Sequence, residues 1–401
     1  MLNRPARNPM GRQIRVIVGM CTLTAPGWLA AAESAPATAP VATVIAVPPV
    51  AVYRDPGRYN SFPDIERLPD GRLLCVFRDA TFPDRVRHIE ADARIVGSIS
   101  TDEGRSWSKP VEIYDSPACQ NDPSIVVLRD GRILLTFFNW IGRSADYVAE
   151  HKPPYARRVD RGEWGAFAEP GGVHRLWGQA RTLTWEKEAT LTTGSNTILR
   201  ATSSAVLETR GGTLLLPFYG RSQAEPCDQA YVLHSTDGGK SWSDAILLAA
   251  DPDKKVAMQE PGLVETAEGH IVALLRTSGA EDHLYMTRST DDGRRWAPAQ
   301  RTDLIGHPPE ALRLPDNRLL VVYGYRHKPF GVRACVSPDG GRTWDRGREL
   351  VITATGEHGD LGYPSACLTG DGHVVVVYYM NGAGTRDRWI ESKRIPLTML
   401  R

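Results

Sequence analysis

Charged residues and one tyrosine recur at comparable places along this chain, beside runs of apolar residues. Carboxylates and a phenol stand where some of these runs begin: Asp64, Asp122, Glu260, Glu310 and Tyr363. Guanidiniums stand where other runs end: Arg78, Arg221, Arg276 and Arg326. Because arginine holds a carboxylate through two parallel hydrogen bonds, a pit that gathered these groups would suit an anionic sugar.

Each of these residues also has an ordinary explanation. An arginine at the end of a strand is usually a solvated surface residue. The recurrence at equivalent places favours a functional role for the group, although not for any single member. Whether the residues meet depends on the elements that carry them.

A short repeat, S-x-D-x-G-x-x-W, indicates what those elements are. Its copies begin at Ser100, Ser235, Ser289 and Ser337. Aspartate can bond to its own backbone and glycine can adopt positive φ, so the repeat predicts a tight hairpin turn, which the tryptophan then anchors. Repetition at about 50 residues is typical of propellers and solenoids. The aspartates of the repeat are therefore predicted to be structural: Asp102, Asp237, Asp291 and Asp339.

A second series of turns completes the set of repeats. It consists of Asp70-Gly71, Asp130-Gly131, Gly211-Gly212, Glu268-Gly269, Asp316-Asn317 and Asp371-Gly372. Each precedes an apolar run that suits a strand buried on both faces. Six such hairpins predict an all-β fold, a six-bladed β-propeller with four strands in each blade.

This arrangement predicts which residues share a rim. The S-x-D-x-G-x-x-W turns would join the third and fourth strands of blades one, three, four and five. An insertion over residues 143–195 would replace the turn in blade two, and residues 46–53 would close blade six. First strands would begin and second strands would end at the opposite rim, so the charged residues would gather there.

The two ends of the 401-residue chain predict its domain organisation. Residues 1–32 have the order of a secretory signal, with four arginines, then an apolar stretch, then small residues up to Ala32. A membrane anchor is disfavoured because Pro26 and Gly27 interrupt the stretch. Residues 33–50 are predicted to be an Ala/Pro-rich lead-in and residues 51–401 the propeller. We therefore expect a secreted or periplasmic protein with no membrane span after signal cleavage.

Composition limits the partners. The formal net charge is +1, from 48 basic and 47 acidic side chains, and no basic stripe occurs, so nucleic acid is not expected to bind. Cys119 and Cys227 lie in predicted loops and could pair, but their spacing does not demand it. No Cys/His cluster has metal-ligand spacing, so we expect no zinc or other metal and no cofactor.

With these features the chain resembles the sialidase (neuraminidase) superfamily, over nearly its whole length after residue 55. The segment from Gln259 to Arg276 resembles the stretch between that family's catalytic glutamate and second carboxylate-binding arginine. The resemblance implies that Glu260 is the base that activates the nucleophile and that Arg276 binds the substrate. The segment from Gly362 to Leu368 resembles the family's Tyr-Ser-x-Leu stretch, with Pro364 as an insertion, and implies that Tyr363 is the nucleophile.

Other site residues follow from the same resemblance. The segment from Asn121 to Ser124 resembles the second-blade pattern, with Asp122 facing the substrate. Either Arg326 or Arg333 would be the third arginine of the clamp. The loop from Arg78 to Arg94 would supply the general acid, for which Asp92 and His88 are the candidates.

The implied activity is retaining hydrolysis of a terminal acidic sugar from a glycan. Sialidases use tyrosine as the nucleophile, because a carboxylate would be repelled by the substrate's own carboxylate. A phenol of ordinary pKa about 10 needs a neighbouring base, which would be Glu260.

One departure from the family widens the range of substrates. The family's first arginine opens blade one, and Ser61 occupies that place here. Arg58 or Arg78 could compensate; otherwise a related acidic sugar or a neutral sugar is expected. The alternatives are a polysaccharide lyase that uses Tyr363 and His88 without Glu260, and a non-catalytic carbohydrate-binding propeller.

Overall fold

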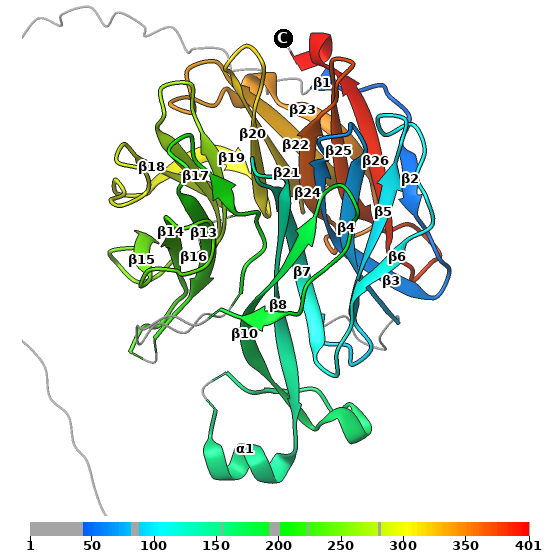
Figure 1. The fold of residues 1–401 in the computed structure, drawn as a ribbon, viewed down its shortest axis with the longest axis vertical. Coiled ribbons are helices and arrows are strands. Elements are labelled where there is room, and N and C mark those ends of the chain that lie inside the picture. The colour runs from blue at the N-terminus through cyan, green and yellow to red at the C-terminus, as the bar shows by residue number, and fades with distance from the viewer. Residues whose placement is uncertain are drawn as a thin grey trace, which may run out of the picture. The chain divides into compact units, whose positions relative to one another are not determined.

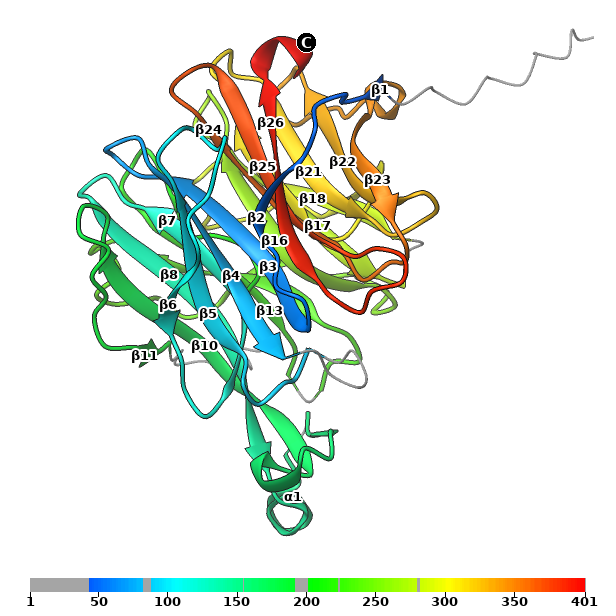
Figure 2. The same cartoon turned by 90° about the vertical axis from the view of Figure 1, so that its right-hand side faces the viewer.

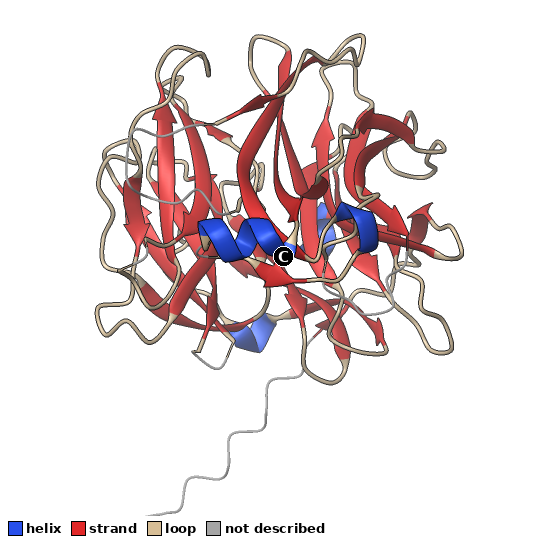
Figure 3. Ribbon diagram, turned by 90° about the horizontal axis from the view of Figure 1, so that it is seen from below, coloured by secondary structure: helices blue, strands red, loops and turns tan. Residues whose placement is uncertain are grey.

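Six small sheets follow one another along the chain and form the blades of a β-propeller (Figures 1 and 2). The computed structural model describes residues 43–400, except 82–87, 154, 192–200, 223 and 280–281. The predicted signal peptide, residues 1–32, and residues 33–42 of the lead-in lie outside this part. Figure 3 shows that strands dominate the domain and that the helical segments are short.

Blades one to three come first in sequence. Blade one comprises β3 (Arg58–Arg67), β4 (Leu73–Thr81), β5 (Arg94–Ser100) and β6 (Val111–Tyr114). Blade two comprises β7 (Cys119–Val127), β8 (Arg132–Arg143), β10 (Phe167–Gln179) and β11 (Ala189–Thr190), with α1 (Ala145–His151), β9 (Arg157–Arg158) and η1 (Gly162–Trp164) between β8 and β10. Blade three comprises β12 (Leu207–Glu208), β13 (Leu214–Gly220), β14 (Gln229–Ser235) and β15 (Ile246–Ala249).

Blades four to six complete the ring. Blade four comprises β16 (Ala257–Glu265), β17 (Ile271–Ser278), β18 (His283–Ser289) and β19 (Gln300–Ile305). Blade five comprises β20 (Pro309–Arg313), β21 (Leu319–Tyr325), β22 (Phe330–Ser337), η2 (Arg346–Arg348) and β23 (Leu350–Gly356), beside which β1 (Thr43–Val44) adds a short parallel strand. Blade six comprises β24 (Gly362–Leu368), β25 (His373–Met380), β26 (Trp389–Pro396) and β2 (Val50–Tyr53), and η3 (Leu397–Leu400) follows.

The ring closes as predicted. β2 pairs antiparallel with β26, with Ala51 opposite Glu391, so residues near the start of the domain complete its last blade. The six-bladed all-β prediction is therefore confirmed.

The repeated turns have the predicted chemistry. In the first copy the Gly104 N–H donates to Ser100 Oγ over 2.8 Å, and the Arg105 and Ser106 N–H groups donate to Asp102 Oδ1 over 3.0 and 2.9 Å. Gly104 has φ 86°, which a side chain would strain. Asp102 therefore closes the turn between β5 and β6, on the rim away from the charged residues.

Apolar strands supply the core. Six hydrophobic clusters each pack between two adjacent blades. In one of them, Phe77 of blade one and Val375 of blade six belong to the same cluster. Burial of these faces provides the main stabilisation of the ring. None of the helices in the described part of the chain has the length and apolar character needed to cross a bilayer.

Blade two differs from the prediction. The segment expected to be an insertion, residues 143–195, contains the third and fourth strands of the blade, β10 and β11, and only residues 144–166 extend beyond the common pattern. The sequence of β10 hides its identity because Pro170, Gly171 and Gly172 interrupt the apolar alternation, and the strand is bulged there.

Candidate active site

Four first strands bend at the same register position. Pairing with the second strand shifts between Ser61 and Asp64 in β3, Asn121 and Ser124 in β7, Gln259 and Gly262 in β16, and Gly362 and Ser365 in β24. The residue at each bend has positive φ: 54° at Phe62, 46° at Asp122, 48° at Glu260 and 44° at Tyr363. A proline follows in every case.

This repeated bulge aims one side chain per strand toward the centre of the ring. The left-handed conformation costs a residue with a β-carbon roughly 1–2 kcal/mol, and such strain is retained mainly where function requires it. Bulges re-aim side chains, and proline tolerates them because it needs no ladder hydrogen bond. Pro364, which the family resemblance treats as an insertion, is therefore one member of a device that four blades share.

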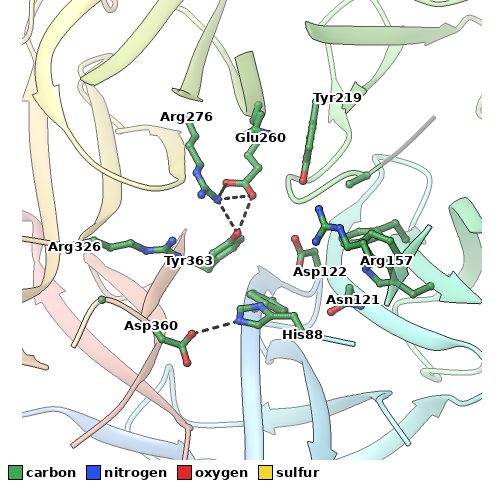
Figure 4. A pocket seen from close by; sticks show the side chains of 16 residues that line it. His88, Asn121, Asp122, Arg157, Tyr219, Glu260, Arg276, Arg326, Asp360 and Tyr363 are labelled. Atoms are coloured by element: carbon green, nitrogen blue, oxygen red, sulfur yellow. Dashed lines mark hydrogen bonds and ion pairs between the residues drawn. The ribbon is translucent and has the colours of Figure 1, made fainter. Parts of the chain in front are cut away.

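A cavity of about 470 Å³ opens above these bulges (Figure 4). Most of the predicted site residues line it: His88, Asp122, Glu260, Arg276, Arg326 and Tyr363. Its other polar or aromatic lining residues include Asn121, Trp140, Arg157, Tyr219, Gln259 and Asp360. Six residues from distant parts of the sequence thus meet as expected.

Tyr363 and Glu260 form the centre of the site. The Tyr363 hydroxyl donates to Glu260 Oε1 over 2.8 Å. Arg276 Nη1 donates to both Glu260 oxygens, over 2.9 and 3.0 Å, and to the Tyr363 hydroxyl oxygen over 3.2 Å. The phenol therefore has a base to accept its proton and a cation beside its oxygen.

The electrostatics keep Tyr363 protonated in the resting site. Burial, followed by the negative charge of Glu260, raises the pKa of Tyr363 well above its ordinary value, although Arg276 opposes the shift. Burial, again followed by Glu260, also raises the pKa of Asp122 well above its usual range. The cavity floor thus presents a neutral phenol, and a carboxyl group of raised pKa, beside Glu260.

The structure distinguishes between the two candidates for the third arginine. Arg326 lines the cavity, with Cζ 5.5 Å from the centroid of the Tyr363 ring. Arg333 lies outside the lining, where its guanidinium stacks over Tyr325 at 4.5 Å and lies 3.8 Å from Glu349. Arg326 is thus the one placed to contact a ligand.

His88 is paired with a carboxylate that sequence reasoning missed. Its Nε2 lies 3.1 Å from the Tyr59 hydroxyl and 3.5 Å from Asp360 Oδ1. Asp360 also accepts hydrogen bonds from Tyr379 over 3.0 Å and from Arg388 Nε over 2.9 Å. Burial alone would raise the pKa of Asp360, but His88, Arg388 and Tyr59 outweigh it and lower that pKa.

The position of Asp360 offered a weak signal. It stands three residues before the predicted nucleophile, in the polar segment before β24. Its role depends on contacts with Tyr59 and His88, which the sequence places far away.

Three other predicted site residues do not reach the cavity. Asp92 accepts from the Thr81 N–H over 3.0 Å and the Thr81 hydroxyl over 2.9 Å, and lines a separate depression. Arg78 has no exposed surface, forms an ion pair with Glu90 and donates to the Gln120 carbonyl over 3.2 Å. These placements correct the expectations of an acid at Asp92 and a clamp at Arg78.

Asp64 is the third. It lies two residues past the bulge, where it accepts from the Ile125 N–H over 2.7 Å and the Ser365 hydroxyl over 2.5 Å. Burial raises its pKa to about 6. Asp64 therefore joins β3 to β7 and β24 beneath the cavity instead of lining it.

Ser61, which stands at the place of the family's first arginine, is buried. The next residue, Phe62, packs with its ring centroid 4.7 Å from that of Tyr363 and 5.0 Å from that of His88. Arg58 pairs with Asp79 over 2.8 Å, and it lines the same separate depression as Asp92. Neither Arg58 nor Arg78 replaces the missing cation.

No group of His, Cys, Asp and Glu residues within the described part of the chain is arranged to hold a metal ion. Cys75, Cys119, Cys227, Cys335 and Cys367 are all free thiols.

Comparison with known proteins finds a matching family and a similar structure. Residues 160–376, more than half of it, match the model of the BNR repeat-like domain family. A structure from Dyadobacter fermentans, of a protein of unknown function, is 27% identical with a TM-score of 0.78, over 87% of this chain and 97% of that one. No curated protein matches the chain.

Two sialidase structures share the fold at lower identity. The NanB sialidase of Streptococcus pneumoniae is 14% identical with a TM-score of 0.64, over 88% of this chain and 71% of that one. The intramolecular trans-sialidase of Ruminococcus gnavus is 13% identical with a TM-score of 0.58, over 85% and 95%. The family match, together with six blades and four repeated turns, shows that the chain belongs to the BNR repeat-like domain family, and its fold is shared with sialidases.

Proposed function

We propose that this protein is a retaining exo-glycosidase that releases a terminal sialic acid or a related acidic sugar from a glycan. The observation that carries the proposal is the 2.8 Å hydrogen bond from Tyr363 to Glu260, with Arg276 bonded to both residues. A nucleophile in hydrogen-bond contact with its base is the arrangement that covalent catalysis needs.

The first step would form a covalent glycosyl-enzyme. The Tyr363 oxygen attacks the anomeric carbon as its proton passes to Glu260, and the Arg276 guanidinium stabilises the charge that develops on the phenol oxygen. The glycosidic oxygen departs with a proton from His88. Asp360 stabilises the protonated imidazole through Nε2, so Nδ1 is the ring nitrogen that would serve the leaving group.

The second step would reverse these roles. His88 takes a proton from water, which attacks the anomeric carbon, and Tyr363 leaves as a phenol that recovers its proton from Glu260. Two displacements at one carbon retain its configuration.

The arginines indicate an acidic substrate. Arg276 and Arg326 lie on the same side of the cavity as Tyr363 and could hold a carboxylate at the reacting carbon (Figure 4). A neutral phenol approaches such a carbon without the repulsion that a carboxylate nucleophile would meet. With Ser61 in place of the family's first arginine, uronic acids join sialic acid as candidate sugars.

A lyase is the second candidate, favoured by one observation. Tyr363 and the Asp360-linked His88 line the same cavity, so they could serve as the acid and base of a β-elimination next to a uronate carboxylate. Such an enzyme would break the same type of C–O bond but leave a double bond in one product.

One experiment separates these functions. The purified chain is incubated with sialylated, uronic and neutral glycans, and the products are analysed by mass spectrometry and ultraviolet absorbance. We expect a saturated reducing sugar of retained configuration, and none with Tyr363→Phe. An unsaturated product would replace the hydrolase with the lyase, whereas binding without any product would indicate a carbohydrate-binding propeller.

We also propose that the protein acts outside the cytoplasm. The arginine-rich, then apolar, order of residues 1–32 supports export to the periplasm or the medium. Extracytoplasmic glycans would then be the substrates.

A further inference from the structure

The extension of blade two, residues 144–166, has no counterpart in the described parts of the other five blades. It contains α1, β9 and η1, and it projects past the edge of the blade (Figures 1 and 2). Within it, β9 pairs with β10, with Arg157 opposite Ala168, so the backbone at Arg157 belongs to the sheet.

Three contacts fix the extension against its neighbours. The Tyr155 hydroxyl donates to the Arg221 carbonyl over 2.8 Å, just past the second strand of blade three. Trp164 Nε1 donates to the Pro117 carbonyl over 2.7 Å, before β7. Arg161 lies 3.5 Å from Glu90, two residues from His88. Contacts on several sides give the extension a defined position at the rim.

Arg157 brings a positive charge from this extension to the wall of the cavity. Its Cζ lies 4.8 Å from the centroid of the Trp140 ring, and both residues line the cavity. Stacking on an indole holds the planar guanidinium in one orientation. Because a guanidinium has five N–H donors, it can keep contacts with the protein and still bind an anion.

The cations of the site therefore lie on two sides. Arg326 and Arg276 come from blades five and four, whereas Arg157 lies across the cavity from Arg326 (Figure 4). The carboxyl group nearest Arg157 in this view is Asp122, and burial raises its pKa well above the usual range. Because burial disfavours its charged form, Asp122 opposes a second anion less than an exposed carboxylate would.

We infer that Arg157 and Trp140 form a second anion subsite, so that the preferred substrate carries a second carboxylate or sulfate besides the group bound by Arg276 and Arg326. The inference rests on the proposed function and narrows it to glycans with two acidic groups close together. Arg157 determines specificity in this scheme and takes no part in bond breaking.

The test measures binding, separately from turnover. The full chain carrying Tyr363→Phe, which cannot cleave the ligand, is titrated calorimetrically with three disaccharide probes. Two are doubly charged: a diuronide, and a disaccharide with one carboxylate and one sulfate ester. The third is singly charged: the same diuronide with one carboxylate esterified. Arg157→Gln is then introduced. Its matched control is Arg158→Gln, since Arg158 is the next residue, is exposed and pairs with Asp160 over 2.9 Å.

We expect Arg157→Gln to weaken binding of the doubly charged probes about tenfold, equivalent to about 1.4 kcal/mol, and to leave the affinity for the singly charged probe unchanged. Arg158→Gln should change neither affinity. A preference for the diuronide over the sulfated probe, or the reverse, identifies the second group. Equal affinity for singly and doubly charged probes in the unsubstituted background, or equal losses in Arg157→Gln, would overturn the subsite alone. Absence of binding by every probe would exclude uronic substrates and overturn the subsite, and the proposed function would then depend on the sialylated glycans of the product assay.

Discussion

Tyr363 and Glu260 share a 2.8 Å hydrogen bond although 103 positions separate them and they belong to blades six and four. Both occupy the same bulge position of their first strands, with φ of 44° and 48°. The contact therefore arises from the symmetry of the propeller: equivalent positions in different blades converge on one axis. Only the identities of the side chains differ, and in the proposed mechanism those identities make one residue the nucleophile and the other its base.

Tyr363→Phe removes one oxygen and should abolish catalysis while the fold persists. The ring keeps its packing on Phe62, so the melting temperature should stay the same. We expect kcat to fall by about 10³-fold or more, as for other nucleophile replacements. Glu260→Gln should lower kcat by about 10²- to 10⁴-fold, because the phenol loses its proton acceptor. Full activity in Tyr363→Phe would refute the nucleophile assignment.

His88 and Asp360 should control the leaving group. We expect His88→Ala to lower kcat strongly for natural glycans and only slightly for aryl glycosides whose leaving groups need no proton. Asp360→Asn removes the carboxylate charge beside His88 Nε2, so it should lower kcat for natural glycans more than for these aryl glycosides. The check is kcat of both variants against the acidity of the leaving group. A uniform loss on all substrates would leave His88 a structural residue.

The sequence predicted the features that depend on local chemistry. Asp102 and Gly104 define a turn within five residues, and the turn repeats often enough to count blades. Glu260 and Tyr363 follow because each lies beside its own recognisable strand. These predictions needed no knowledge of contacts between distant segments.

The errors have a different physical origin. Asp64 was misplaced because the bulge adds one residue to β3 between Ser61 and Asp64. Phe62 therefore takes the position equivalent to Glu260, and the carboxylate two residues later lies below the cavity. Arg78 shares the register position of Arg276, yet Glu90 draws it into the protein. Asp360 was missed because its role depends on Tyr59 and His88. Non-local pairing of charges, which decided these cases, has no signature in a single sequence.

Glu66 should make the fold less stable as the pH rises. Burial, followed by the charge of Asp64, raises the pKa of Glu66 to about 8 from 4.5. Because the unfolded chain releases this proton more readily, the contribution to stability is complete below pH 4.5 and is lost as the pH rises toward 8. Glu66→Gln should flatten that decline and melt above the wild type at pH 9. Calorimetry at several pH values is the measurement, and parallel curves for the two proteins would contradict the expectation.

Asp102→Ala tests the separation of turn and site. It removes the acceptor of the Arg105 and Ser106 N–H groups, so we expect a loss of about 1–3 kcal/mol of unfolding free energy. Activity per folded molecule should stay unchanged, because the turn lies on the rim opposite the cavity. Denaturant unfolding and active-site titration measure the two quantities. A stable but inactive variant would show that the turn takes part in catalysis.

Substitution of Arg78 tests whether this residue is a buried structural charge or a ligand of the substrate. Arg78 has no exposed surface and is the nearest partner of the buried Glu90. Arg78→Met should leave that carboxylate with only Arg161, 3.5 Å away, and cost about 3–5 kcal/mol. The double variant Arg78→Met/Glu90→Leu should recover much of that stability, because it removes the buried carboxylate as well. Its KM should match the wild type, whereas its kcat should fall because Glu90 no longer links Arg161 to the loop that carries His88. Chemical unfolding and steady-state kinetics separate these outcomes. A large rise in KM with unchanged kcat would restore Arg78 as a substrate ligand.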